Sequence, residues 1–172
     1  VTFVSENDMA DMIASGILDR NQCILIPVGA DVREVKSNPA GVLRKGHNII
    51  YVGNMSYGPN IEAVTWFVKD IFPQILKRIS HVKFYIVGKE PNNEVMSLAG
   101  KNVAVTGEVD SVDEYYNLAD LVVLPLKNGG GVKVKLLEAV SYQKPIVSSS
   151  VGVEGTIYSD GKSIPVADTS TE

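Results

Sequence analysis

Residues 121–131 read LVVLPLKNGGG. The first four side chains are all apolar, which is typical of a strand that is buried on both faces of a sheet. Strands of this kind belong to parallel sheets that carry helices on both sides. Three glycines follow, and after them the pattern predicts a helix over residues 132–142. The stretch therefore predicts one strand–helix unit of a parallel sheet, with a glycine-rich loop between strand and helix.

The same alternation extends over the rest of the chain. Further strands are predicted at residues 24–26, 48–52, 82–87, 103–106 and 146–147. Further helices, with apolar residues at helical spacing, are predicted at residues 6–18, 61–78 and 111–118. Strands that alternate with helices in this way predict an α/β fold, a Rossmann-like doubly wound parallel sheet.

Local signals mark the ends of two of these helices. Asn60 is a candidate N-cap for the helix over 61–78, and Pro73 should kink or divide that helix. Ser111 and Glu114 have the spacing of a capping box, which predicts that another helix begins at Ser111.

The composition excludes several classes of protein. The 172 residues are 45% apolar and 21% charged, which suits one globular domain. A net charge of -4 argues against a broad nucleic-acid-binding face. The single cysteine, Cys23, excludes an internal disulfide and a Cys-rich zinc site, and His47 and His81 lie far apart in sequence. We therefore expect no metal site.

Glycine follows the apolar run at four predicted strand ends. These glycines are Gly53, Gly88, Gly107 and residues 129–131. Parallel strands end at the same edge of the sheet, where ligands bind, and glycine lets the backbone approach a ligand closely. The alternative is that each glycine merely permits a tight turn from strand to helix. The four glycine positions together favour a ligand crevice.

The three glycines at 129–131 are the most specific of these features. Backbone N–H groups at a helix start, free of side chains, suit a phosphate. The loop lacks the Gly-Lys-Ser/Thr ending of a P-loop, and the dinucleotide fingerprint belongs on the first βα turn. Lys133 and Lys135 follow, and a lysine there could meet a diphosphate as a point charge. The alternative for Lys133 is a solvated helix residue.

Glu138 stands in the otherwise apolar run 136–140. A carboxylate in such a place is costly unless it accepts hydrogen bonds, which the two hydroxyls of a ribose would supply. Lys135 offers the alternative of an i,i+3 ion pair. Glu138 also lies about two helical turns, roughly 10 Å, beyond the glycines, and this distance suits a nucleoside diphosphate. We therefore favour the ribose.

An ordered set of motifs covers most of the chain. The pieces are residues 51–55, 59–67, 85–88, 105–107, 119–125, 129–139, 144–147 and 152–155. Together they resemble the carboxy-terminal, nucleotide-sugar-binding domain of the group 1, or family 4, retaining glycosyltransferases, which combine two Rossmann-like domains in the GT-B architecture. The ordered set is far more specific than any single motif.

The resemblance implies transfer of a sugar from a nucleotide diphosphate sugar to an acceptor, with retained anomeric configuration and without a cofactor or metal. Glu138 would hold the ribose, the glycine loop and its lysines would contact the diphosphate, and residues 105–109 would border the base. The resemblance identifies no catalytic residue in this chain. The donor-binding residues that it implies are Gly53, Asn54, Gly107, Glu108, Gly130, Gly131, Val132, Lys133, Lys135 and Glu138.

Two positions depart from the family's pattern. Gly130 stands where the first glutamate of a Glu-x7-Glu pattern is expected, as in a glycine-rich subgroup, and this leaves the usual contact to the donor sugar's hydroxyls open. Residues 54–57 contain no Arg or Lys after the strand that ends at Gly53. More of the diphosphate charge would then rest on Lys133, Lys135 and helix-terminal amides.

The resemblance also divides the chain. Residues 1–46 are predicted to be an inter-domain segment and a remnant of an amino-terminal domain, with a loop at 35–46. Residues 47–172 are predicted to be the Rossmann-like donor-binding domain. The expected partners are the nucleotide sugar and the missing amino-terminal domain with its acceptor site, and the fragment alone should have no turnover. The expected location is the cytoplasm, with peripheral association at the inner face of the membrane as an alternative for the full-length protein.

Two other functions stay open. The first is a non-catalytic nucleotide-binding or interaction domain of the same fold, which Gly130 and the absent partner domain favour. The second is a related nucleotide-sugar epimerase, which would need more titratable residues in the cleft than the sequence offers. Titration with UDP, GDP and ADP separates nucleotide binding from a pure interaction role, and product analysis separates transfer from epimerisation.

Overall fold

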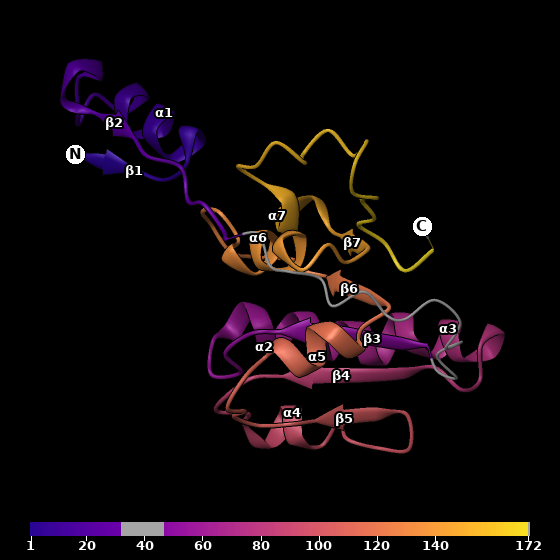
Figure 1. Cartoon of the computed structure of the whole chain (residues 1–172). Coiled ribbons are helices and arrows are strands. Elements are labelled where there is room, and N and C mark those ends of the chain that lie inside the picture. Colours follow the sequence, from indigo (N-terminus) through magenta and orange to yellow (C-terminus); the bar gives the residue numbers. More distant parts are fainter. Residues whose placement is uncertain (32–46, 172) are drawn as a thin grey trace.

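The computed structural model describes residues 1–31 and 47–171 of the chain (Figure 1). Its main sheet has five parallel strands, β3 (Asn48–Val52), β4 (Lys83–Val87), β5 (Val103–Val105), β6 (Leu121–Leu124) and β7 (Ile146–Ser148). They are ordered β5-β4-β3-β6-β7 across the sheet. The chain builds outward from β3 in one direction and then outward from β6 in the other, which is the doubly wound, Rossmann-like order. The predicted fold class is confirmed.

Helices follow each of these strands. They are α2 (Gly58–Trp66), the π-helical segment η2 (Phe67–Ile71), α3 (Phe72–Arg78), α4 (Asn93–Met96), α5 (Asp113–Leu118), α6 (Val134–Ser141) and α7 (Ser150–Val153). The π-helical segment η2 divides the helix predicted over residues 61–78, and it ends just before Pro73. This confirms that the proline interrupts the helix.

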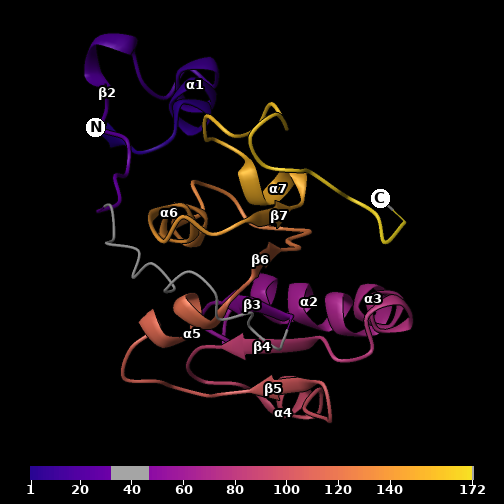
Figure 2. The same cartoon turned by 45° about the vertical axis from the view of Figure 1, so that its right-hand side comes forward.

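The helices cover both faces of the sheet (Figures 1 and 2). The ring of Phe84 lies 4.6 Å from that of Phe67 in η2, whereas the ring of Tyr85 lies 6.1 Å from that of Tyr115 in α5. Neighbouring residues of a strand point to opposite faces, so η2 and α5 lie on opposite sides. Because both faces are covered, all five residues of the central strand β3 are buried.

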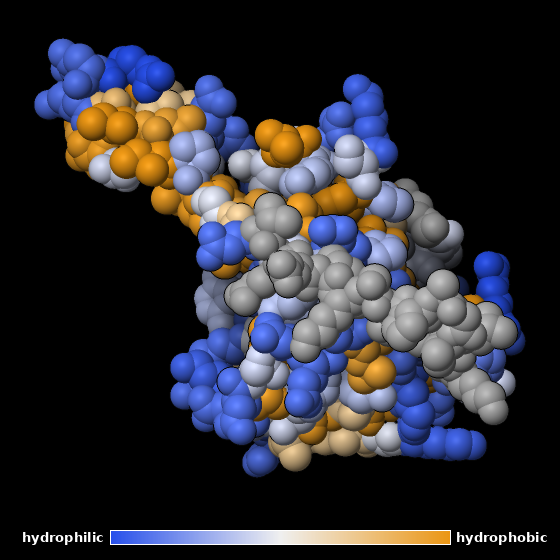
Figure 3. Space-filling model, viewed as in Figure 1, coloured by the Kyte–Doolittle hydropathy of each residue, from blue (hydrophilic) through white to orange (hydrophobic). Residues whose placement is uncertain are grey.

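The first 31 residues form a smaller unit beside the main sheet. Its elements are β1 (Thr2–Phe3), α1 (Glu6–Ala14), the 3₁₀ turn η1 (Arg20–Gln22) and β2 (Ile24–Leu25). β1 and β2 pair in parallel in a separate sheet, and the hydroxyl of Ser5 caps α1 by accepting a hydrogen bond from the amide of Asp8. Apolar surface gathers over this unit in Figure 3, and its exposed apolar residues are Val1, Val4, Ile17, Ile24 and Ile26.

The prediction that Asn60 caps a helix is wrong. α2 begins at Gly58 with Tyr57 as its N-cap and Pro59 in its first turn, which places Asn60 inside the helix. The physical reason is that the Asn60 side chain is buried and bonds other parts of the chain. Its Nδ2 donates to the carbonyl of Asn54 at 2.7 Å, and its Oδ1 accepts from the hydroxyl of Tyr51 at 2.7 Å.

The predicted capping box at Ser111 and Glu114 is also absent. α5 begins at Asp113, with Val112 at the N-cap position and no side-chain cap. The hydroxyl of Ser111 instead accepts from the amide of Asp113 at 3.1 Å, a local turn that competes with helical capping. The helix predicted over 6–18 ends earlier, at Ala14. The predicted loop at 35–46 lies outside the described residues.

Candidate functional site

The carboxyl ends of β3 and β6 form the topological switch point of the sheet. These strands are neighbours in the sheet, but the helices that follow them lie on opposite faces. α2 and η2 lie on one face, whereas α6 lies beside α5, since Tyr142 at the end of α6 stacks on Tyr116 of α5 with ring centroids 4.3 Å apart. In doubly wound sheets ligands bind at such a switch point.

Two of the strand-end glycines are required by close contacts within the protein itself. A Cβ on Gly88 would lie 1.8 Å from the carbonyl oxygen of Gly53, and the φ of Gly88 is +146°. A Cβ on Gly53 would lie 2.9 Å from Nδ2 of Asn60 and 3.1 Å from Nζ of Lys135. At Gly53 and Gly88 the tight-turn alternative therefore explains the glycine. The missing side chain of Gly53 leaves room for the ammonium of Lys135.

Lys135 reaches the switch point from α6. Its Nζ donates to the hydroxyl of Tyr51 at 2.8 Å and to Oδ1 of Asn60 at 2.5 Å, and it lies 4.7 Å from the centroid of the Tyr51 ring. Tyr51 belongs to β3 and Asn60 to α2, so the ammonium joins three elements. These contacts fix one cation at the place where the doubly wound fold binds ligands.

The ammonium of Lys135 has no carboxylate partner among the described residues. Burial lowers its pKa to about 8, and the positive charge of Lys133 contributes to the shift. Burial also raises the pKa of Tyr51 far above its ordinary value, so this hydroxyl stays protonated. A partly desolvated cation with neutral neighbours favours an incoming anion.

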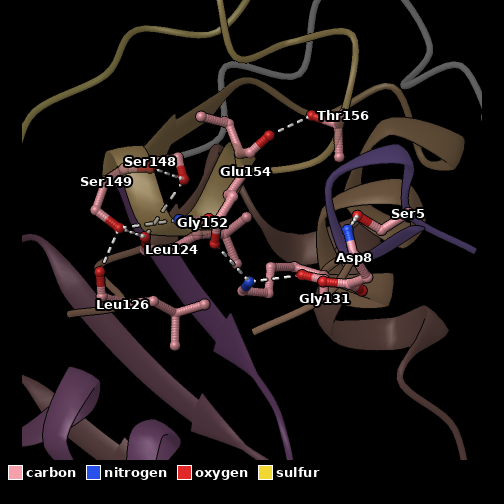
Figure 4. A network of polar contacts seen from close by, with 12 residues as sticks. Ser5, Asp8, Leu124, Leu126, Gly131, Ser148, Ser149, Gly152, Glu154 and Thr156 are labelled. Atoms are coloured by element: carbon pink, nitrogen blue, oxygen red, sulfur yellow. Dashed lines mark hydrogen bonds and ion pairs between the residues drawn. The ribbon is translucent and has the colours of Figure 1, made fainter. Parts of the chain in front are cut away.

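The glycine loop is held by Lys133, whose side chain is only 8% exposed. Gly129 and Gly131 have φ values of +122° and +71°, which favour glycine, and a Cβ on Gly130 would meet nothing within 4 Å. Nζ of Lys133 donates to the carbonyl of Gly131 at 2.6 Å and lies 3.7 Å from the carboxylate of Glu154. Figure 4 marks these contacts at Gly131 and Glu154. Lys133 therefore stabilises the loop, and it is not a solvated residue.

α6 begins at Val134, two residues later than the sequence predicts. Lys133 is its N-cap residue in an extended conformation, and the amide of Leu136 donates to the carbonyl of Lys133 at 2.8 Å. The glycines consequently do not run directly into the helix. Val132 and Lys133 separate the loop from the first turn of α6.

Glu138 does not pair with Lys135, so the i,i+3 ion pair does not form. Its Oε2 accepts a hydrogen bond from the hydroxyl of Tyr116 at 3.1 Å. Among the described residues, no donor lies within hydrogen-bond distance of Oε1. The half-buried carboxylate thus keeps one oxygen available for a ligand.

The remaining predicted site residues are Asn54, Gly107, Glu108 and Val132, and none of them contacts Lys135 or Glu138 through a hydrogen bond among the described residues. Oδ1 of Asn54 accepts from the amide and the hydroxyl of Ser56, both at 2.9 Å, which occupies this side chain locally. Gly107, with a φ of +70°, and the exposed Glu108 follow β5, on the far side of β4 from β3. Val132 lines a separate cavity.

That cavity, of about 800 Å³, lies between the amino-terminal unit and α6–α7. Residues from both units line it, among them Val4, Leu25, Val132, Leu137 and Glu154. Its lining among the described residues does not include Lys135 or Glu138. This cavity and the cation at the switch point are therefore different features of the molecule.

The two histidines lie close together, although they are far apart in sequence. The rings of His47 and His81 are 4.9 Å apart at the amino ends of β3 and β4. In the part of the chain that the structure describes, no group of three His, Cys, Asp or Glu side chains could hold a metal ion. Nor does any described helix have the length and apolar character to cross a membrane.

Sequence reasoning missed the tyrosines and the asparagine that contact the two charged site residues. Tyr51 and Asn60 hold Lys135, and Tyr116 holds Glu138. The available signal was polar atoms in core positions: a tyrosine inside the strand 48–52, an asparagine on an apolar helix face and a tyrosine on the buried side of α5. Such groups need partners when they are buried.

Comparison with known proteins identifies relatives of this chain. A family model described as "Glycosyl transferases group 1" matches residues 46–171. An uncharacterized 44.6 kDa protein in the cps region of Klebsiella pneumoniae is 26% identical over 129 residues, 70% of this chain and 33% of that protein. A phosphatidyl-myo-inositol mannosyltransferase of Mycobacterium leprae is 24% identical over 149 residues, 83% of this chain and 39% of that protein. The chain thus spans 33% to 39% of the length of these relatives.

Solved structures share the fold. TarM of S. aureus superposes with a TM-score of 0.75 at 14% identity, over 98% of this chain and 33% of its own, and a variant of it is known in complex with UDP. Anabaena HepE, known in complex with UDP-glucose, superposes with a TM-score of 0.63 at 17% identity, over 88% of this chain and 45% of its own. At these identities the likeness concerns the fold.

Proposed function

Since the chain belongs to the group 1 glycosyl transferases, we propose that its five-stranded domain binds the nucleotide diphosphate sugar from which the whole protein transfers a sugar. Transfer proceeds with retained anomeric configuration to an acceptor bound elsewhere in the full-length protein. UDP or UDP-glucose in the solved structures of similar proteins supports a nucleotide sugar as the donor.

The observation that carries the proposal is the position of Lys135. A diphosphate needs positive charge and hydrogen-bond donors, and Lys135 offers both at the switch point, where no carboxylate of the described residues neutralises it. The backbone amides after Gly130 and Gly131 add donors from the loop. Lys133 supports this loop from inside, through its bond to the Gly131 carbonyl.

The remaining parts of the donor follow from α6 and the sheet edge. Lys135 and Glu138 lie three residues apart on this helix, so one nucleotide can contact both. The free Oε1 of Glu138 accepts from a ribose hydroxyl, and the base lies toward residues 105–109, beyond β5. Gly53 faces the diphosphate across the crevice.

Calorimetric titration of the chain with UDP, GDP and ADP tests the proposal. Lys135→Met should weaken the best of these ligands by about 1.5–3 kcal/mol, because a hydrogen bond to a charged group is lost. Glu138→Ala should weaken it by about 1–3 kcal/mol. Lys127→Met is the matched control, since Lys127 lies over the ring of Trp66 in a groove whose described lining includes neither Lys135 nor Glu138. Failure of the unaltered chain to bind any of the three ligands would overturn the proposal.

One observation favours a second function, a nucleotide-binding domain that does not catalyse transfer. Gly130 provides no side chain for the donor sugar, and the space around it is open. Product analysis on the full-length protein distinguishes the two. A new glycosidic bond establishes transfer, whereas nucleotide binding without any product from a panel of nucleotide sugars supports the second function.

A further inference from the structure

Tyr116 makes a contact that packing alone does not require. Its side chain is fully buried in α5, and its hydroxyl donates to Oε2 of Glu138 in α6 at 3.1 Å. The two residues are 22 positions apart, so the bond depends on how the two helices pack together. It leaves the other carboxylate oxygen of Glu138 without a partner among the described residues.

The tyrosine ring is itself held in place. Tyr116 stacks on Tyr142 with ring centroids 4.3 Å apart and ring planes 7° from parallel. The hydroxyl of Tyr142 donates to the carboxylate of Asp113, in the first turn of α5. Two stacked and buried rings leave Tyr116 few alternative rotamers, which fixes the position of its hydroxyl.

The protonation of Tyr116 suits a permanent donor. Burial first, and then the negative charge of Glu138, raises the pKa of Tyr116 far above its ordinary value. The hydroxyl therefore keeps its proton at any pH at which the protein would be assayed. A hydrogen bond from a neutral donor also orients the carboxylate without neutralising its charge.

We propose that Tyr116 is a positioning residue that orients the Glu138 carboxylate so that Oε1 faces the ribose hydroxyls of a bound nucleotide. The inference rests on the proposed function, because it concerns the same donor site. It predicts that Tyr116 influences the recognition of the ribose and leaves the binding of the diphosphate to Lys135 unchanged.

The experiment compares UDP with 2′,3′-dideoxy-UDP in calorimetric titrations of the whole chain. Tyr116→Phe keeps the buried ring and removes only the hydroxyl. We expect it to lower the affinity for UDP by about three- to tenfold and to leave that for the dideoxy nucleotide unchanged. In the Glu138→Ala background, adding Tyr116→Phe should cause no further loss, because the two residues act through one carboxylate.

Tyr142→Phe is the matched control. It removes a hydroxyl from the other ring of the same stack, and this hydroxyl donates to the carboxylate of Asp113. We expect unchanged affinities for both nucleotides. Calorimetry reports affinity per competent molecule, so partial unfolding of a variant lowers the stoichiometry and does not mimic a loss of ribose discrimination.

The outcomes separate this inference from the proposed function. Equal losses for both nucleotides, or no loss for either, would overturn the role of Tyr116 while leaving nucleotide binding established. An additional loss in the double variant would do the same. No binding of either nucleotide by the unaltered chain would overturn the proposed function, and the inference with it.

Discussion

At the residue scale, Lys135 stands out because keeping its buried side chain charged costs free energy of folding. Burial lowers its pKa from 10.5 to about 8, so between these values the unfolded chain binds more protons than the folded chain. The free energy of unfolding should therefore rise with pH through this window. Below about pH 8 the folded protein carries the ammonium at a cost.

Lys135→Met should consequently stabilise the protein at pH 7 by about 1–3 kcal/mol, since the hydroxyl of Tyr51 and Oδ1 of Asn60 still bond each other. Urea denaturation at pH 7 and pH 9.5 measures the effect. The free energy of unfolding of the wild-type chain should rise between these two pH values, and that of the variant should not. A less stable variant at pH 7 would mean that Lys135 is structural.

The affinity for a nucleoside diphosphate should change with pH for the same reason. The anion binds the protonated form of Lys135, so the affinity of the unaltered chain should fall as the pH rises above about 8. Lys135→Arg keeps its charge throughout and should show a flat profile between pH 7 and 9.5. Parallel profiles for the two proteins would contradict a role of Lys135 in binding.

Gly88 is the residue where a single added methyl group should be least tolerated. A Cβ there would lie 1.8 Å from the carbonyl oxygen of Gly53, at a φ of +146°. Gly88→Ala should lower the free energy of unfolding by about 3 kcal/mol or more. Gly58→Ala is the control, because a Cβ at Gly58, in the first turn of α2, meets nothing within 4 Å. Thermal melting compares the variants, and equal midpoints would refute the expectation.

At the scale of elements, the glycine loop is ordered by its link to α7 and not by α6 alone. Lys133 bonds the Gly131 carbonyl and lies near Glu154, which follows α7. The loop that we propose to contact the diphosphate therefore depends on a contact between two strand–helix units.

Lys133→Met should loosen this loop. Losing the bond to Gly131 should cost about 0.5–1.5 kcal/mol of stability and speed hydrogen exchange of the amides at 130–133. Glu154→Gln removes only a half-exposed partner, 52% accessible, and should leave this exchange nearly unchanged. Unaltered exchange in Lys133→Met would show that the loop does not need the tether.

The start of each helix was harder to predict than its existence. Apolar spacing predicts α2, α5 and α6 because the period is visible within a few turns. The caps predicted at Asn60 and Ser111 do not form, because a side chain caps a helix only if its hydrogen-bond partner is the helix's own first turn. Asn60 found its partners in Tyr51 and Lys135, which are 9 and 75 positions away.

At the scale of the whole molecule, the described residues form a five-stranded domain and a small two-stranded unit. We expect residues 1–172 to bind a nucleotide without transferring sugar, because catalysis in a closing cleft needs the surface opposite the donor. Measuring product formation by this chain and by the full-length protein, with the same nucleotide sugar, checks the expectation. Sugar transfer by residues 1–172 alone would refute it.

The sequence by itself determined the parallel α/β class, the strand positions and the placing of glycine at the strand ends. Each of these depends on hydrophobic period and backbone freedom, which a short stretch of residues contains. Only the tertiary structure decided that Lys133 is held by the loop and Glu154, that Lys135 bonds Tyr51 and Asn60, and that Glu138 bonds Tyr116. These choices depend on side chains 21 to 84 positions apart, whose contacts exist only once the helices have packed on the sheet.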